Sequence, residues 1–116
     1  MRRIVAVIAL GAAAVGCSTV DPSPKLKAAT SAIDAAKAAG AANVPAANDL
    51  LAQAEKYLAN AQNLIKSGDN AAAINQLSLA SAAADDAKLT ATEANNIARS
   101  KELDAQIADL KAKLGK

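Results

Sequence analysis

Few side chains in this sequence could take part in covalent chemistry. The 116 residues include one Cys and one Tyr, at positions 17 and 57, and no His. Without His or a second Cys, the usual transition-metal sites, Cys–His nucleophile pairs, His-based acid–base catalysis and disulfide frameworks are excluded. We therefore predict a protein that is not an enzyme and that binds no metal and no cofactor. Cys17 remains as the residue whose surroundings indicate a reaction.

Carboxylates form the other candidate site. Asp85 and Asp86 are adjacent, and Glu93 follows two helical turns later. Adjacent positions on a helix point about 100° apart, and the stretch has no Gly of the kind that a calcium loop needs at its sharp turn. We interpret these carboxylates as part of a solvated helix face.

The first 16 residues have the layout of a secretory signal. Arg2 and Arg3 precede an apolar stretch, Ile4 to Leu10, and mostly small residues follow as far as Gly16. The apolar run has about 14 residues, whereas a helix needs about 20 to span a bilayer. An uncleaved transmembrane anchor is therefore the weaker interpretation.

The four residues Ala14-Val15-Gly16-Cys17 resemble the bacterial lipobox. The resemblance implies that residues 1–16 are a lipoprotein signal peptide. It also implies that Cys17 receives a diacylglyceryl thioether and becomes the new N-terminus, although Ala14 stands where the family usually has Leu. By the sorting behaviour of enteric lipoproteins, Ser18 after the Cys implies a lipid anchor on the periplasmic face of the outer membrane.

The charges of the chain are balanced and dispersed. The sequence has 13 basic and 11 acidic side chains, and removal of residues 1–16 takes away Arg2 and Arg3. A near-neutral chain with one aromatic residue lacks the basic surface and the stacking residues that nucleic-acid binding requires. It also lacks the Lys/Arg-rich face and the Trp/Phe face of a membrane-surface helix. We expect no nucleic acid among its partners, and contact with the membrane only through the lipid.

Residues 25–116 are predicted to form an alanine-rich helical domain. Alanine occurs 34 times in the sequence; it favours helix but buries little area per residue. Residues 17–24 are predicted to be the lipidated Cys and a short tether. Ser23 and Asp69 are the expected N-caps of the first and third helices. Proline and glycine divide the domain into three helices, at about 24–39, 45–67 and 69–114.

Each helix carries a face of apolar or small residues. The first has Leu26, Ala29, Ile33 and Ala36. The second follows the 3.6-residue period, and its face includes Tyr57 as a packing residue: Leu50, Leu51, Ala54, Tyr57, Leu58, Ala61, Leu64 and Ile65. The third has a seam of small residues that would let another helix approach closely: Ala73, Leu77, Ala80, Ala84, Ala87, Ala91, Ala94, Ala98, Lys101, Ala105, Ala108 and Ala112.

The third helix is longer than its neighbours can cover. The second helix, about 33 Å long, reaches only about as far as Ala91 when it folds back. We predict an all-α helical hairpin or small three-helix bundle with a long, overhanging, coiled-coil-like C-terminal helix. Its end carries the predicted partner-binding seam, for a second copy or another helical protein: Leu103, Ile107, Leu110 and Leu114. A kink near Asn95-Asn96 that folds this end back is the alternative.

Two families resemble parts of the helical region. The stretch from Ala61 through Gly68-Asp69 to Ala80 is similar to one tetratricopeptide repeat, but Asp85 stands where the later Pro would be. We expect a helical hairpin with the same packing. The segments Ala-Ala-Lys-Ala-Ala-Gly, Leu-Leu-Ala-Gln-Ala-Glu-Lys and Lys-Ser-Gly-Asp-Asn-Ala-Ala-Ala resemble an Ala-rich domain family of bacterial envelope lipoproteins of unknown function, sometimes fused to outer-membrane-protein-A-like domains. That likeness implies a fold and a compartment.

The stretch from Lys88 to Lys116 resembles the major murein lipoprotein class, which is lipidated, Ala-rich, coiled and ends in Lys. In that class the terminal Lys is joined to peptidoglycan, which makes Lys116 a candidate link. Leu114-Gly115 stands where the class usually has Tyr-Arg. The sequence thus predicts a non-catalytic, lipid-anchored scaffold or interaction protein of the Gram-negative envelope, with an outer-membrane-to-peptidoglycan tether as the alternative.

Overall fold

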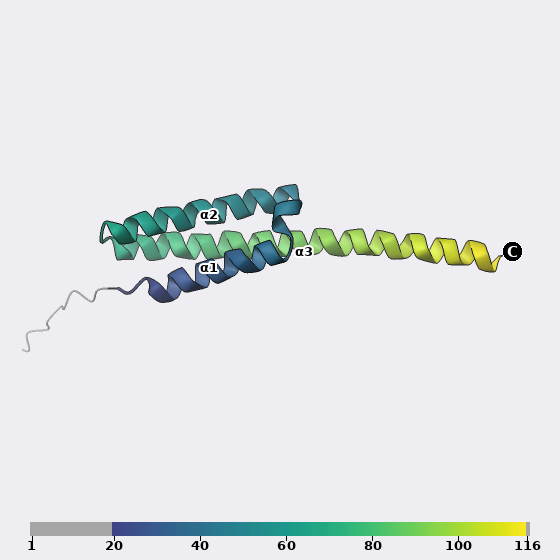
Figure 1. Cartoon of the computed structure of the whole chain (residues 1–116), viewed down its shortest axis with the longest axis horizontal. Coiled ribbons are helices and arrows are strands. Elements are labelled where there is room, and N and C mark those ends of the chain that lie inside the picture. Colours follow the sequence, from purple (N-terminus) through teal and green to yellow (C-terminus); the bar gives the residue numbers. More distant parts are fainter. Residues whose placement is uncertain (1–19, 116) are drawn as a thin grey trace, which may run out of the picture.

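The computed structural model describes residues 20–115, which form helices and no strands (Figure 1). Helices α1 and α2 lie along the first half of α3, and the second half of α3 projects beyond them. The predicted all-α fold with a long, overhanging C-terminal helix is confirmed. In chain order the elements are α1 (Ser23–Ala38), the short 3-10 helix η1 (Ala41–Asn43), α2 (Pro45–Lys66) and α3 (Asn70–Leu114).

Helix α1 begins one residue earlier than predicted. Ser23 is its first residue and not its N-cap, and the backbone N–H of Ser23 donates a hydrogen bond to Oδ1 of Asp21 at 2.9 Å. An Asp carboxylate readily accepts from the amide two residues along the chain, so Asp21 fixes the start of the helix before Ser23 can act as a cap. Pro24 in the first turn lacks an N–H that would need a partner. The predicted tether is correspondingly shorter.

Glycine follows the end of both shorter helices. Gly40 has a φ of 85° and Gly68 a φ of 86°, in the left-handed region that favours glycine. Asp69 comes next and caps α3, because its Oδ1 accepts a hydrogen bond from the backbone N–H of Ala72 at 3.1 Å. The cap predicted for the third helix is confirmed, and the turn sends α3 back along α2.

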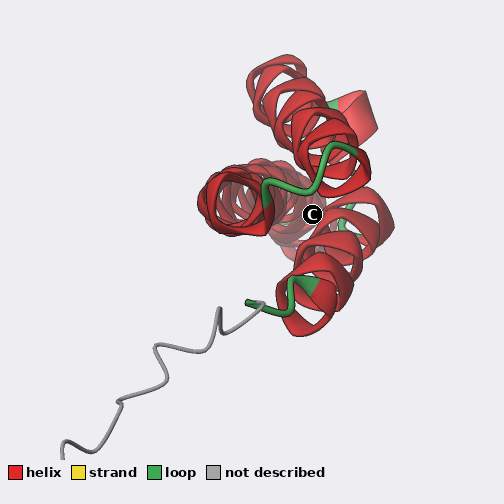
Figure 2. Cartoon of the chain, turned by 90° about the vertical axis from the view of Figure 1, so that its left-hand side faces the viewer, coloured by secondary structure: helices red, strands yellow, loops and turns green. Residues whose placement is uncertain are grey.

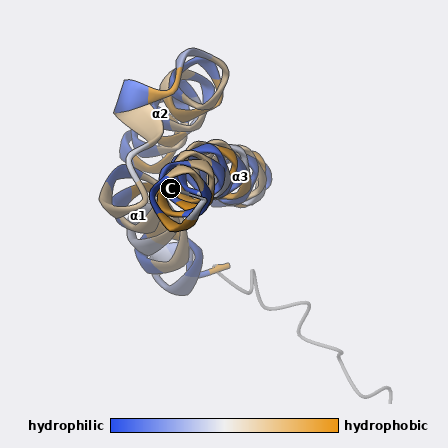
Figure 3. Cartoon of the chain, turned by 90° about the vertical axis from the view of Figure 1, so that its right-hand side faces the viewer, coloured by the Kyte–Doolittle hydropathy of each residue, from blue (hydrophilic) through white to orange (hydrophobic). Residues whose placement is uncertain are grey.

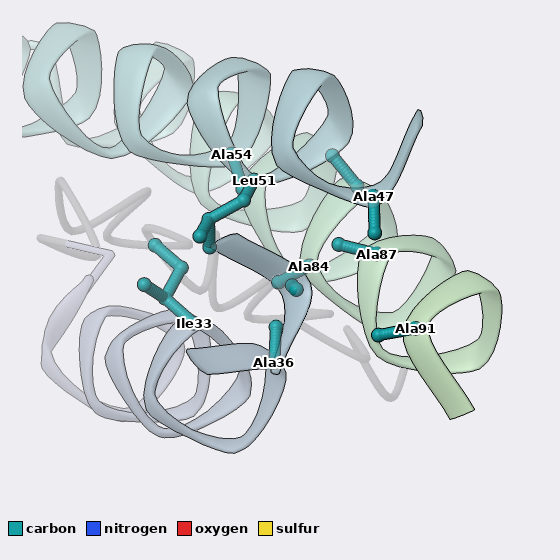
Figure 4. Packing of buried hydrophobic residues seen from close by; sticks show 10 residues of the cluster. Ile33, Ala36, Ala47, Leu51, Ala54, Ala84, Ala87 and Ala91 are labelled. Atoms are coloured by element: carbon teal, nitrogen blue, oxygen red, sulfur yellow. The ribbon is translucent and has the colours of Figure 1, made fainter. Parts of the chain in front are cut away.

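Helices α1 and α2 pack mainly on α3 and much less on each other. In the end-on view they lie on one side of α3 and diverge from each other (Figure 2). Their buried residues form two clusters in which alanine predominates. In the larger cluster, Ile33 of α1 and Leu51 of α2 face the small residues Ala84 and Ala87 of α3 (Figure 4). Small residues on α3 let both helices approach closely.

The faces predicted on α1 and α2 are covered, whereas the seam predicted on α3 is buried only over its first half and is exposed from Ala98 to Ala112. The four residues predicted on α1 and the eight on α2, Tyr57 included, are buried or half-buried. The small-residue seam of α3 is buried from Ala73 to Ala91, and Leu77 is its largest fully buried side chain. Alanine therefore both favours these helices and supplies most of their buried residues.

Helix α3 continues without interruption through Asn95 and Asn96. It has 45 residues and a length of about 68 Å, so the alternative of a kink that folds its end back is wrong. The side-chain amide Nδ2 of Asn95 donates a hydrogen bond to the carbonyl oxygen of Ala39 at 3.0 Å. Carbonyl groups at the end of a helix lack intrahelical partners, and Asn95 satisfies one of them at the end of α1.

Candidate partner-binding surface on α3

The cover that α1 and α2 give to α3 ends close to Ala91. Ala91 is buried, Ala94 is half-buried, and every residue from Asn95 to Gly115 is exposed. This projecting segment is about 30 Å long at 1.5 Å per residue. Apart from the contact of Asn95 with the end of α1, α1 and α2 leave this segment uncovered, in agreement with the length of α2 relative to α3.

The projecting segment carries an aliphatic stripe, defined by the four predicted seam residues. Leu103, Ile107, Leu110 and Leu114 are 51%, 49%, 57% and 85% exposed. Because α3 is one continuous helix, their spacing of four, three and four residues places them on one face. Figure 3 views this end of the molecule, with apolar residues of α3 in orange. Contiguous apolar side chains on an exposed face are typical of interaction sites.

Two more exposed apolar residues lie on α3 nearer its N-terminus than the predicted seam. Leu89 and Ile97 are 66% and 50% exposed, and they border a shallow hollow that also includes Thr92, Glu93, Asn96 and Ser100. Leu89 lies two heptads before Leu103 and therefore on the same face. Polar residues separate Leu89 from Leu103 on this face and hid their shared position, which the four-three spacing could have revealed.

The aliphatic stripe points away from the packed helices. At about 100° per residue, Leu103 lies opposite Ala94 and Ala105, which continue the face that α3 buries against α1 and α2. In the end-on view α1 and α2 both lie on one side of α3 (Figure 2), which is the side of its buried small residues. A partner helix could therefore lie along the stripe without meeting either helix.

Charged residues flank the stripe. Lys113 Nζ and Asp109 Oδ2 form an exposed ion pair one turn apart, at 2.9 Å, of a kind worth only a few tenths of a kcal/mol. Arg99 and Asp104 lie on opposite edges of the stripe and have no ion pair within the described chain. They are five positions apart, which is too far round the helix for a direct contact between the two.

A second ion pair holds α1 against α2 at the base of the projection. Lys37 Nζ and Glu55 Oε1 are 2.7 Å apart, with both side chains about half exposed. The hydrogen bond and the charge of Glu55 raise the pKa of Lys37 above its ordinary value of 10.5. Together with the bond between Asn95 and Ala39, this pair fixes the end of the packed region from which α3 projects.

Two predicted site residues, Cys17 and Lys116, lie outside the described residues. Over residues 20–115, no group of Asp and Glu side chains is close enough to hold a metal ion, and Asp85, Asp86 and Glu93 are exposed. None of the helices in that range combines the length and apolarity that a membrane-crossing segment requires.

Comparisons with protein-family models, with curated proteins and with solved structures found no match to this chain. The family resemblances of the sequence therefore stay predictions. What the chain does has to be inferred from the surface of α3 and from the N-terminal sequence.

Proposed function

We propose that this protein is a non-catalytic, lipid-anchored scaffold of the bacterial envelope, which acts by packing a partner helix against the aliphatic stripe of α3. The observation that carries the proposal is the exposure of all four stripe residues on a helix that projects past the rest of the described fold. Leaving such side chains in water forgoes about 1.5 to 3 kcal/mol each relative to full burial. A helical partner would recover much of this free energy.

The direction of α3 supports the placement of the anchor. Residues 20–22 and the start of α1 lie at one end of the packed region, and α3 projects from the other end (Figure 1). A lipid on Cys17 would hold the packed region close to the membrane through the few residues before Ser23. The aliphatic stripe would then extend away from the membrane, where a helical partner can reach it.

The same geometry favours the alternative function, a tether between the outer membrane and peptidoglycan. Gly115, next to Lys116, is exposed at the tip of α3, at the end of the molecule away from α1's first residues. A covalent bond from the Lys116 amine to the cell wall would place the whole length of α3 between membrane and wall. Analysis of purified wall fragments for a peptide ending in Lys116 tests this alternative.

The proposal is tested by expressing the full chain in a Gram-negative host. Mass spectrometry of the N-terminal peptide is expected to show a diacylglyceryl thioether on Cys17 and none in the Cys17→Ser variant. A photoreactive amino acid at position 107 is expected to form a protein adduct in the envelope, whereas the same group at position 105, on the opposite face, forms little. An unmodified Cys17, or equal adduct formation at both positions, would contradict the proposal.

A further inference from the structure

The residues that follow Glu93 on the exposed side of α3 have the pattern of a two-stranded coiled coil. We call these residues the dimer seam; it consists of Asn96, Ser100 and the four stripe residues, spaced alternately four and three apart. Ile107 occupies the position at which β-branched residues favour two parallel strands, and Leu103 and Leu110 occupy the positions at which Leu does so. The type of residue at each layer therefore fits a parallel pair of helices.

We infer that the partner of the dimer seam is a second copy of this chain, packed parallel and in register along α3. The inference rests on the proposed function, because two copies anchored in one membrane project α3 in the same direction. In this arrangement each seam residue faces its own counterpart. The two packed regions would lie side by side, with their α3 helices between them.

Matching of polar and apolar layers favours this register. In the parallel pair, Asn96 meets Asn96 and Ser100 meets Ser100, while every aliphatic residue meets an aliphatic one. In an antiparallel pair that overlaps over the same length, Leu114 would face Asn96 and Leu110 would face Ser100, leaving polar side chains against apolar ones. A shorter antiparallel overlap would align only the four stripe residues and leave Ser100 and Asn96 outside the contact.

Charges along the edges of the dimer seam favour the same orientation. In a parallel coiled coil, a residue on one edge lies near the residue five positions later on the other helix. Arg99 of one copy therefore lies near Asp104 of the second copy, and by symmetry Asp104 of the first copy lies near Arg99 of the second. An antiparallel pair that overlaps over the whole seam would instead bring Arg99 towards Lys113, a contact between like charges. Neither Arg99 nor Asp104 has an ion-pair partner within residues 20–115.

The fold leaves room for this pairing. At about 100° per residue, the seam lies on the side of α3 away from the small residues that pack against α1 and α2, so two copies can meet without collision between their packed regions. Glu93, one step before Asn96 in the four-three spacing, would face its own counterpart and oppose it electrostatically. The seam is thus expected to end between Glu93 and Asn96.

The short length of the seam explains why a shared membrane matters. Fewer than three heptads hold a coiled coil weakly in free solution. Two copies confined to one surface meet at a much higher effective concentration, as linked binding modules do. We therefore expect the pair to form on the membrane and to dissociate readily in dilute solution.

Disulfide formation in the envelope tests the proposal with the full, lipid-modified chain. Leu103→Cys and Leu110→Cys, each made separately, are expected to give disulfide-linked dimers on mild oxidation, because each new thiol faces its counterpart. Ala105→Cys, on the opposite face, is the matched control, and we expect about tenfold less dimer from it. Lipid attachment at Cys17 is verified in each variant, so that loss of the anchor is distinguished from loss of the pair.

Three outcomes would overturn the proposal. Dimer formation only when Leu103→Cys chains are mixed with Ile107→Cys or Leu114→Cys chains would indicate an antiparallel pair. An absence of dimers from lipid-modified Leu103→Cys and Leu110→Cys chains would exclude a parallel second copy in register, while leaving the scaffold proposal to its own test. Dimers that form equally well in the chain without lipid would contradict the role given to the membrane.

Exchange of charges supplies an independent check. In the Leu110→Cys background, Arg99→Glu and Asp104→Arg are each expected to reduce the disulfide-linked fraction, because each places like charges on facing edges. The double variant restores the complementary pair and is expected to restore the fraction. A double variant no better than either single variant would count against the parallel register.

Discussion

The side-chain amide of Asn95 binds the carbonyl oxygen of Ala39 across the interface between α3 and α1, at 3.0 Å. The two residues are far apart in the sequence, yet they mark the same level of the molecule, at which α1 ends and α3 begins to project. Past this level, every described residue of α3 is exposed. The hydrogen bond thus lies at the boundary between the part of the chain that folds on itself and the part that is free to bind.

Asn95→Ala removes this hydrogen bond, and we expect that loss to offset the higher helix propensity of alanine. Alanine is a better helix former than asparagine by up to about 0.7 kcal/mol. The side chain of Asn96 has no hydrogen bond within residues 20–115, so Asn96→Ala should be mildly stabilising. Asn95→Ala should be less stable than Asn96→Ala by about 1 kcal/mol. Urea unfolding of soluble chains beginning at Ser18, at low concentration, measures both; equal stabilities would contradict a role for Asn95. These chains keep both core clusters, which lie within residues 26–91.

Truncation of the largest buried side chain should destabilise the fold strongly. Leu77 is fully buried on α3, whereas Leu79, on the same helix, is 46% exposed. We expect Leu77→Ala to lower the free energy of unfolding by about 3 kcal/mol, because it leaves a cavity among small residues that cannot fill it. Leu79→Ala, with the same change in helix propensity, should cost less than about 1 kcal/mol. Similar losses of unfolding free energy for the two variants in urea would contradict the burial of Leu77.

The turn between α2 and α3 should tolerate only residues that adopt a positive φ. Gly68 has a φ of 86°, and an added Cβ would meet no atom within 4 Å, so the cost of a side chain there is the backbone conformation alone. Gly68→Ala is expected to cost about 1 to 2 kcal/mol. Gly68→Asn should cost less, because asparagine enters the left-handed region more easily. Thermal unfolding that ranks the Ala variant above the Asn variant would refute this account.

The ion pair between α1 and α2 gives the fold a dependence on alkaline pH. Glu55 raises the pKa of Lys37 above 10.5, so its contribution to stability is present below the unfolded value and is lost as the pH rises through the folded value. The stability difference between the parent chain and Lys37→Gln should therefore shrink as the pH increases past 10.5. Thermal unfolding of both chains over this range, with Glu55→Gln as the control, measures it; a difference that grows would contradict the pairing.

Much of the fold could be predicted because local signals dominate it. Glycine with a positive φ follows α1 and α2, Asp69 caps α3, and the periodic faces of α1 and α2 are the buried ones. The overhang of α3 followed from comparing the lengths of two helices. Caps, glycines and periodic faces suffice to predict this fold because residues 20–115 form helices, and because few contacts decide how these helices pack.

The remaining features depend on contacts that the sequence does not display. Asn95 looked like a helix breaker because its partner, Ala39, is identified only once the helices are packed. Ala83 is buried beside the predicted seam because both α1 and α2 pack on α3 and widen its covered face. Leu89 joins the face of the aliphatic stripe only when α3 is continuous through the polar residues that separate it from Leu103.

The central claim is that a helix covers the aliphatic stripe of α3 in the envelope. The most direct test is the rate at which a membrane-impermeant maleimide labels Ile107→Cys in the lipid-modified chain, after the outer membrane has been made permeable, relative to Ala105→Cys on the opposite face. The account predicts labelling of position 107 that is slower by about tenfold or more, because the partner helix excludes the reagent. Equal labelling of the two positions would show that the stripe is open to water and would contradict the account.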